Sequence, residues 1–356
     1  MPGPATPSRP AASQTGISLG PDLTQWQLWW EFNKDPFLLL KEAVHDRGVT
    51  TGSAQWYMGP SRRRGQPTGL GPTVEQKRRV ILPALKRALV DTNNPDLVTA
   101  SLIALGKVGM DHREFQLLPL ISRYLSNKQQ EVRETAALAL GITQMPAALP
   151  ILRELVTDSA AGRRRLGRLE VDDRTRAFAA YGIGILASAR GAATDVKMAA
   201  YETLKELVDD RRASRRDTKI AAVNALGVLE LDASKARQKR LMWQTLQTLW
   251  TYYQQDLGKG EQFIQAHVPV AIGRLLGRVI SPEHARYKKA FAAELTGGRR
   301  RNNAIYQSDV IALGWLVDAR HEPDKVYSKT LLDYYHRGRD QQSRYFALMA
   351  MAAIGG

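Results

Sequence analysis

The chain contains no cysteine, and this absence excludes disulfides, thiolate metal sites and a cysteine nucleophile. It also lacks a long hydrophobic run. The longest, Phe346–Ile354, has nine residues, whereas a membrane-spanning helix needs about 20. The first ten residues contain no apolar segment like that of a secretory signal. No membrane segment is predicted, and a cytoplasmic location is favoured.

Histidine is scarce as well, and its spacing predicts no metal site. The six histidines are His45, His112, His267, His284, His321 and His336. No two of them lie three to five residues apart, so no helix carries a pair of imidazoles on one face. A Walker-type phosphate loop is also absent from the sequence. We therefore predict no metal, no cofactor and no catalytic residue, and we expect a protein that is not an enzyme.

Acidic residues are too few to balance the basic ones. Lysine and arginine number 51 against 35 aspartates and glutamates, which gives a formal net charge of +16 and a pI of about 10.0. Such a balance favours anionic partners, for example nucleic acid, phosphorylated surfaces or acidic proteins. The alternative is a basic surface that only keeps the protein solvated, and composition does not decide between the two.

In place of catalytic motifs, the chain has a short pattern that recurs seven times. Each copy is a run of apolar and small residues that ends in one small residue. The final residues are Gly106, Gly141, Gly182, Gly227, Gly273, Gly314 and Ala352. They follow one another at intervals of 35 to 46 residues, a period that is typical of a helical repeat array. We expect each repeat to be a pair of helices packed on its neighbours.

Local signals indicate where the helices of a pair begin. The first helix of the early repeats contains Pro83, Pro119 or Pro150, and proline is tolerated only near a helix start or at a bend. For the second helix, we expect polar residues to act as N-terminal caps. The expected caps are Asp96, Glu131, Asp173, Asp217 and Ser308. Glycine inside a helix costs about 1 kcal/mol relative to alanine, so the recurring glycine indicates where the next repeat comes too close for a side chain.

The order of a capping acid, Val-Arg, small residues and Ala-Leu-Gly is best kept in residues 131–141 and 217–227, and it resembles that of HEAT repeats. The nearest subtype is the short bacterial form that also occurs in phycobilisome-lyase-like proteins. This resemblance covers residues 73–356 and implies an all-α fold, a right-handed α-solenoid of about seven HEAT-like helix pairs. Two repeats depart from the pattern, at Pro269 and at Trp315, and both are expected to disturb the stacking locally.

Three segments are predicted ahead of the array. Residues 1–21 are rich in Pro, Ala, Ser and Gly and are expected to be a disordered leader. Residues 22–47 place Trp26, Trp29 and Trp30 at helical spacing, and are expected to form a Trp-rich helical cap on the first repeat. Residues 48–72, rich in glycine and arginine, are expected to be a long loop.

Two features near the end of the array add expectations. Trp243 and Trp250 lie seven residues apart on one expected helix, so they form an apolar stripe that we predict to pack in the core. The chain ends at Gly356 after an apolar helix without the polar cap that a finished solenoid needs. Either the array is truncated there, or this end docks on another molecule such as a second copy.

Arginines gather in the turns that join the first helix of a pair to the second. The candidates for polyanion binding are Arg163, Arg164, Arg165, Arg168, Arg211, Arg212, Arg215, Arg216, Arg299, Arg300 and Arg301. Turns of this kind emerge on one side of a solenoid, so we expect these arginines to line up as one basic edge. The arginine fork suits phosphate or carboxylate groups. The alternative is that charged turns only keep the repeats soluble.

The sequence therefore predicts a non-enzymatic interaction scaffold that binds a protein partner on its helical-repeat surface. The alternative function is binding of nucleic acid or another polyanion along the basic edge. Neither the identity of the partner nor the oligomeric state can be deduced from the sequence.

Overall fold

The computed structural model describes residues 72–189, 191–210, 216–258, 260–277, 281–297 and 301–355, and all of them belong to one compact unit. Within these ranges the regular elements are helices, apart from an isolated bridge between His112 and Phe115. The all-α prediction is therefore confirmed. The predicted leader, the Trp-rich cap and the Gly/Arg-rich loop up to residue 71 lie outside the described residues and stay predictions.

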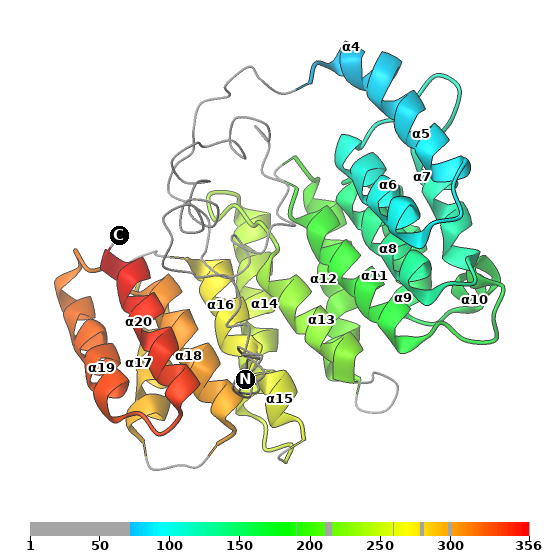
Figure 1. Cartoon of the computed structure of the whole chain (residues 1–356). Coiled ribbons are helices and arrows are strands. Elements are labelled where there is room, and N and C mark those ends of the chain that lie inside the picture. Colours follow the sequence, from blue (N-terminus) through cyan, green and yellow to red (C-terminus); the bar gives the residue numbers. More distant parts are fainter. Residues whose placement is uncertain are drawn as a thin grey trace, which may run out of the picture. The chain divides into compact units, whose positions relative to one another are not determined.

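The helices follow one another in pairs (Figure 1). The pairs are α5 (Leu82–Val90) with α6 (Pro95–Val108), α7 (Leu117–Ser122) with α8 (Gln130–Ile142), α9 (Ala148–Val156) with α11 (Asp173–Ala187), α12 (Thr194–Asp209) with α13 (Arg216–Gly227), α14 (Ala236–Gln254) with α16 (Val268–Leu276), α17 (Pro282–Thr296) with α18 (Asn303–Leu316), and α19 (Lys325–Arg337) with α20 (Gln341–Gly355). Shorter elements extend or join them: α4 (Val74–Gln76), η1 (Lys77–Ile81), η2 (Arg123–Ser126), α10 (Ala160–Leu166), α15 (Gln262–Gln265) and η3 (Glu322–Asp324).

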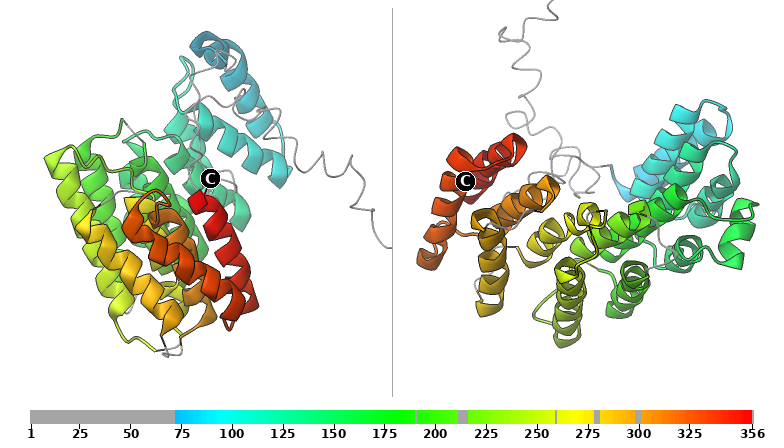
Figure 2. Two further views of the ribbon diagram at one scale, coloured as in Figure 1. Left: turned by 90° about the vertical axis from the view of Figure 1, so that its left-hand side faces the viewer. Right: turned by 90° about the horizontal axis from the view of Figure 1, so that it is seen from below.

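The pairs stack in a single direction. Each second helix contacts the second helix of the next pair, in the order α6, α8, α11, α13, α16, α18 and α20. Figure 2 shows the resulting row of second helices, with the first helices in a layer beside it. This arrangement of repeated pairs around a continuous core is the predicted α-solenoid.

Small residues set the distance between consecutive second helices. A Cβ atom added to Gly184 would lie 2.8 Å from Ala225 Cα, and one added to Gly227 would lie 2.6 Å from Ala271 Cα. The same relation holds along the array, each glycine facing a small residue of the next helix: Gly106 and Ala139, Gly141 and Gly182, Gly184 and Ala225, Gly227 and Ala271, Gly273 and Ala312, Gly314 and Ala350. The predicted reason for the recurring glycine is thereby confirmed.

One position in this series differs from the prediction. In the third repeat the sequence pattern takes Gly182 as the final small residue, but Gly182 faces Ala137 of the preceding repeat. Gly184 is the residue that packs on the following repeat, at Ala225. The two glycines, separated by one residue, therefore pack on different neighbours. The final small residue of this repeat is Gly184, and the sequence pattern places it two residues too early.

A polar residue eight positions before the small residue ties the two helices of a pair together. Arg133 Nη1 donates to the carbonyls of Asn127 and Lys128 at 3.0 Å, and Arg176 Nε donates to Val156 O at 3.0 Å. Gln265 does the same in α15, with Nε2 at 2.9 Å from Tyr252 O. The last carbonyls of a helix have no partner within that helix, and those of Val156 and Tyr252 are of this kind, whereas Arg133 binds the two residues that follow η2. Binding of these carbonyls is the role of Arg133 and Arg176 at this position of the repeat.

The starts of the second helices differ from the predicted caps. The N-cap residues are Asn94 in α6, Gln129 in α8 and Asp172 in α11, and the predicted caps Asp96, Glu131 and Asp173 lie in the first turn instead. Ser308 is wrong as a cap, because α18 begins at Asn303 behind Asn302. A carboxylate one to two residues inside the helix still complements the helix dipole. An acidic residue in the first turn is therefore easily mistaken for the N-cap when only the sequence is known.

The two departures from the repeat pattern change the array only locally. Pro269 lies in the first turn of α16 and leaves that helix nine residues long. The contact between α16 and α18 nevertheless persists through Gly273 and Ala312, beside the Cβ atom of Trp315.

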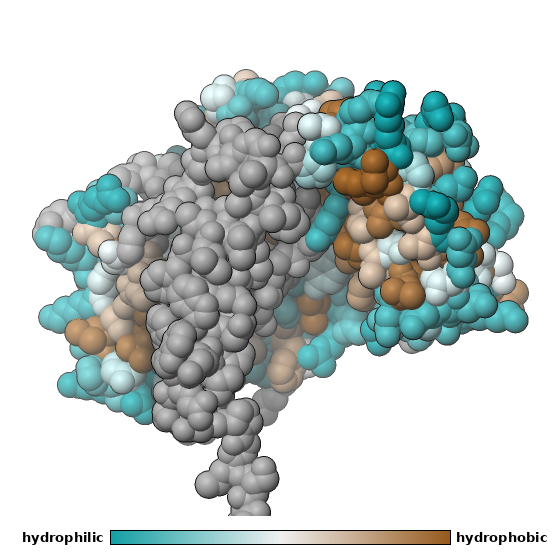
Figure 3. All heavy atoms as spheres, turned by 45° about the horizontal axis from the view of Figure 1, so that its top comes forward, coloured by the Kyte–Doolittle hydropathy of each residue, from teal (hydrophilic) through white to brown (hydrophobic). Residues whose placement is uncertain are grey.

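Exposed apolar side chains occur at both ends of the described array. They include Val80, Val90 and Leu97 in the first pair and Tyr345, Leu348 and Met349 in the last. Figure 3 shows brown apolar patches among hydrophilic side chains at both ends. No helix among the described residues is long and apolar enough to cross a membrane.

The close approach of the second helices predicts the effect of adding one methyl group. We expect Gly227→Ala to lower the free energy of unfolding by about 1–3 kcal/mol, because the new Cβ would overlap the backbone of Ala271. Urea denaturation measures the effect. Gly191→Ala is the control, since a Cβ there meets nothing within 4 Å. Equal stability of the two variants would contradict the packing argument.

Candidate functional site

The predicted basic edge runs through the turns that join the first helix of a pair to the second. Figure 1 shows two short helices within such turns, α10 at the right of the view and α15 at its lower margin. Five of the predicted arginines lie outside the described residues: Arg211, Arg212, Arg215, Arg299 and Arg300. The other six are described, and their surroundings differ.

The α10 turn holds four of these arginines, and two of them are bound to acids of the same repeat. Arg163 makes two hydrogen bonds to Asp158, of 2.9 and 2.6 Å, and Arg165 donates to Glu154. The pKa of Asp158 is lowered first by its hydrogen bond from Arg163. Arg164 and Arg168 are exposed, and neither makes an ion pair within the described residues. Only these two present unneutralised charge on this turn.

The remaining described candidates, Arg216 and Arg301, have opposite environments. Arg216 is exposed at the start of α13, with its guanidinium 4.9 Å from the centre of the Phe263 ring. The side chain of Arg301 is only 6% exposed, and its Nη1 lies 3.1 Å from Glu294 Oε1. Its guanidinium also packs 4.7 Å from the Tyr253 ring centre. Arg301 is therefore an internal residue, and it does not face the solvent as predicted for a polyanion site.

Beside Arg301 lies a carboxyl group in the core. Asp309 in α18 is fully buried, and Tyr253 donates a hydrogen bond of 3.2 Å to its Oδ1. Burial raises the pKa of Asp309 well above its ordinary value of 3.8, and the nearby charge of Glu294 raises it further. The side chain is therefore held as a neutral acid under conditions that ionise an exposed aspartate.

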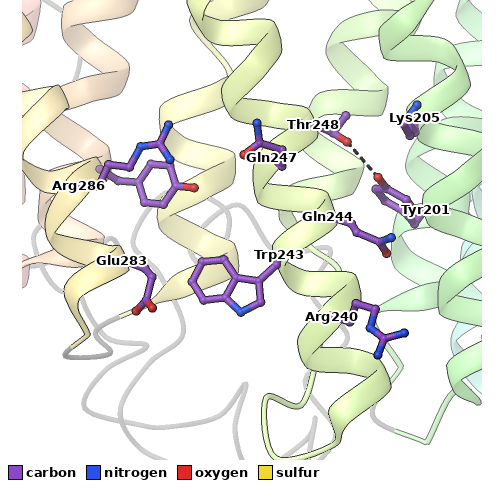
Figure 4. Close-up of a pocket in the computed structure, with 10 residues that line it drawn as sticks. Tyr201, Lys205, Arg240, Trp243, Gln244, Gln247, Thr248, Glu283 and Arg286 are labelled. Carbon is purple, nitrogen blue, oxygen red and sulfur yellow. Dashed lines mark hydrogen bonds between the residues drawn. The ribbon is translucent and has the colours of Figure 1, made fainter.

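A groove on the layer of first helices is a further candidate site (Figure 4). It has a volume of about 610 Å³ and lies between α12, α14 and α17. Its lining residues are Tyr201, Lys205, Arg240, Trp243, Gln244, Gln247, Thr248, Glu283, Arg286 and Tyr287. The groove forms because α14 and α17 touch far less than their partners α16 and α18 do.

Aromatic packing closes one part of the gap between α14 and α17 and leaves the other part open. Trp250 is buried, with its ring centre 5.2 Å from that of Tyr287 and 6.2 Å from that of Phe291. The core prediction is confirmed for Trp250. Trp243, two turns earlier on α14, is only partly buried and lines the groove. It also packs against the core cluster, so its predicted place in the core is confirmed in part.

Polar contacts fix side chains on the floor and at the rim of the groove. Tyr201 from α12 and Thr248 from α14 share a hydrogen bond of 3.0 Å between their hydroxyl groups, drawn in Figure 4. Gln247 Nε2 donates to Thr251 Oγ1 at 3.1 Å. These bonds hold side chains of two helices in place before any ligand arrives.

Positive charge predominates in the groove. Arg240 and Arg286 are exposed, and neither makes an ion pair in the part of the chain that the structure describes. Lys205 is bound to Asp209 at 2.6 Å. Glu283, the one acid of the lining, has its pKa lowered chiefly by a hydrogen bond from Ser281. This site could not be predicted from the sequence, because its residues come from three helices and only Trp243 gave a signal.

Histidines do not form a metal centre in the described ranges. No group of three or more His, Asp or Glu side chains suited to a metal ion occurs there. His267 belongs instead to a row of hydrogen bonds across second helices: Asn224 Nδ2 lies 3.3 Å from the Tyr181 hydroxyl and 3.4 Å from His267 Nδ1.

Comparison with known proteins finds one family match, over part of the chain. A family model described as HEAT repeats matches residues 82–171. No curated protein matches the chain. Two crystal structures, both titled as engineered proteins of the Northeast Structural Genomics Consortium, are 12% and 14% identical to it. They cover 77% and 76% of this chain and 96% and 67% of their own, with TM-scores of 0.32 and 0.34.

The two tryptophans of α14 are expected to respond differently to truncation. Trp250→Ala should cost about 3–5 kcal/mol of unfolding free energy, because it empties a buried aromatic cluster. Trp243→Ala should cost about 1 kcal/mol or less, since this side chain lines an open groove. Urea denaturation of both variants measures the difference, and a large loss for Trp243→Ala would assign it to the core.

Replacing Asp309 should change the pH dependence of folding. An acid with a raised folded pKa stabilises the fold fully below pH 3.8, and this contribution is lost as pH rises towards the folded pKa. Asp309→Asn cannot ionise, so it should melt at a higher temperature than the parent at pH 7–8. The difference should vanish near pH 4. Asp333→Asn, at an exposed position of α19, is the control and should show no such trend.

Proposed function

The chain is a HEAT-repeat protein, and from this premise we propose that it is a non-enzymatic scaffold that binds a protein partner in the groove between α12, α14 and α17. HEAT repeats generally mediate protein–protein interactions. The proposal assigns no catalytic residue and no cofactor. It concerns a surface whose side chains come from three consecutive repeats.

The composition of the groove is the observation that supports this proposal. Its lining includes one tryptophan, two tyrosines and two arginines. Tryptophan, tyrosine and arginine are the residue types that dominate the binding energy of protein interfaces. Trp243 is accessible, whereas the hydrogen bond between Tyr201 and Thr248 holds the floor rigid. A rigid site with an exposed aromatic side chain loses little conformational entropy on binding.

A second candidate function is polyanion binding along the basic edge. Arg164, Arg168 and Arg216 support it, because they are exposed on neighbouring turns. The net charge of +16 favours it as well. Arg211, Arg212, Arg215, Arg299 and Arg300 remain predicted members of this edge. Arg163 and Arg165 would have to leave their acidic partners before they could contact phosphate.

In-cell photo-crosslinking tests the scaffold proposal. A p-benzoylphenylalanine side chain in place of Gln247, at the exposed rim of the groove, should form a covalent adduct with one or a few specific proteins. Trp243→Ala in the same chain should abolish the adduct. The readout is a shifted, protease-sensitive band identified by mass spectrometry.

The control places the same crosslinker at Arg87, an exposed position of α5. Adducts that are equally strong at positions 87 and 247 would indicate random collision and contradict a groove partner. An adduct at position 247 that nuclease removes would favour the second candidate function.

A further inference from the structure

Two unpaired cations lie on either side of the accessible indole in the groove. Arg240 belongs to α14 and Arg286 to α17, and Figure 4 shows them on opposite sides of Trp243. Both side chains are exposed, and within the described ranges neither has a carboxylate partner. Two other cations near them are already paired: Arg237 is 2.7 Å from Asp195, and Lys205 is bound to Asp209.

Arg286 is held in place by the aromatic wall of the groove. Its guanidinium carbon lies 5.2 Å from the Trp250 ring centre and 5.8 Å from that of Tyr287. Stacking of this kind fixes the plane of the guanidinium and leaves its edge, with the N–H donors, free to meet a planar anion. A carboxylate matches this edge through two parallel hydrogen bonds.

The side chains between the two arginines suit a peptide backbone. Gln244 and Gln247 are exposed on α14, one helical turn apart. The amide nitrogen of Gln247 is bound to Thr251, so its oxygen is the group that remains to accept a backbone N–H. Trp243 offers an apolar face next to them.

We propose that the groove recognises an acidic segment of a partner protein. Two carboxylates flanking one aromatic or apolar side chain would pair with Arg240 and Arg286, and the apolar side chain would pack on Trp243. This inference rests on the proposed scaffold function and adds the chemical class of its partner.

The surrounding charges favour a short acidic peptide over a nucleic acid strand. Glu283 lies in the lining itself, and Glu202 of α12 is exposed, whereas Glu206 and Asp209 are paired with Arg153 and Lys205. A phosphate backbone brings one negative charge per nucleotide, so a strand that extends beyond the groove would meet these acids. A peptide places its carboxylates only where the two arginines are.

Fluorescence anisotropy with defined peptides tests the inference on the full chain. The probes are fluorescein-labelled peptides with one aspartate on each side of one central residue, which is varied from phenylalanine to leucine to glycine. The phenylalanine and leucine peptides should bind more tightly than the glycine peptide. Binding should weaken as salt rises, since it depends on charge. Peptides with lysine in place of aspartate should not bind.

Substitutions locate the binding in the groove. Arg240→Glu, Arg286→Glu and Trp243→Ala should each weaken binding by at least about tenfold, as expected for hot-spot residues. Arg240→Gln and Arg286→Gln are the milder variants if charge reversal disturbs folding, which circular dichroism reports. Arg87→Glu reverses an exposed arginine on α5 and should leave the affinity unchanged.

Three outcomes would overturn the inference: no preference for aspartate over lysine peptides, equal losses in the groove variants and in Arg87→Glu, or tighter groove-dependent binding of a labelled ten-residue oligothymidylate. The experiments also distinguish failure of this inference from failure of the proposed scaffold function. A protein adduct at position 247 without any preference for acidic peptides leaves the scaffold in place and rejects only the acidic class.

Discussion

The structure depends on how closely the second helices approach one another. At each step of the array a glycine of one helix faces an alanine or glycine of the next, with no room for a further carbon atom. Glycine weakens a helix by itself, so this arrangement is stable only because dispersion contacts between the backbones and the core beneath them compensate. The buried polar residue eight positions earlier then fixes the first helix to the second in several pairs. Together these two contacts define the repeat.

The groove is a consequence of the same constraint. Because small residues bring the second helices together, larger side chains in the outer layer hold the first helices further apart. Between α14 and α17 the rings of Trp250, Tyr287 and Phe291 fill the gap. Where these rings end, the gap stays open and Trp243 lines it. A candidate binding site thus arises from the unequal spacing of two helix layers, with no loop required.

The period of the small residues was sufficient to predict the solenoid, because a helix pair of this length can bury its apolar face only on its neighbours. The roles of single glycines, tryptophans and arginines depend on contacts between helices, and the repeat pattern does not contain these contacts. Gly182 and Gly184 look equivalent until the neighbouring helices are seen. Helical spacing assigns Trp243 and Trp250 to one face, but it does not say how far α17 extends over that face. Arg301 follows two other arginines, and only its contacts with Glu294 and Tyr253 distinguish it as internal.

The line of glycine and alanine contacts is also the place where the array would pivot if it bent. Side chains that interlock resist rotation, whereas two smooth backbones permit small changes of angle about their contact. A slight rotation at Gly273 and Ala312 displaces α14 and α17 by more than it displaces α16 and α18, because the outer helices lie further from the axis of rotation. Bending of the array and the width of the groove around Trp243 are therefore coupled quantities. A ligand that fills the groove would make the array harder to bend, and bending of the array would change the affinity for the ligand.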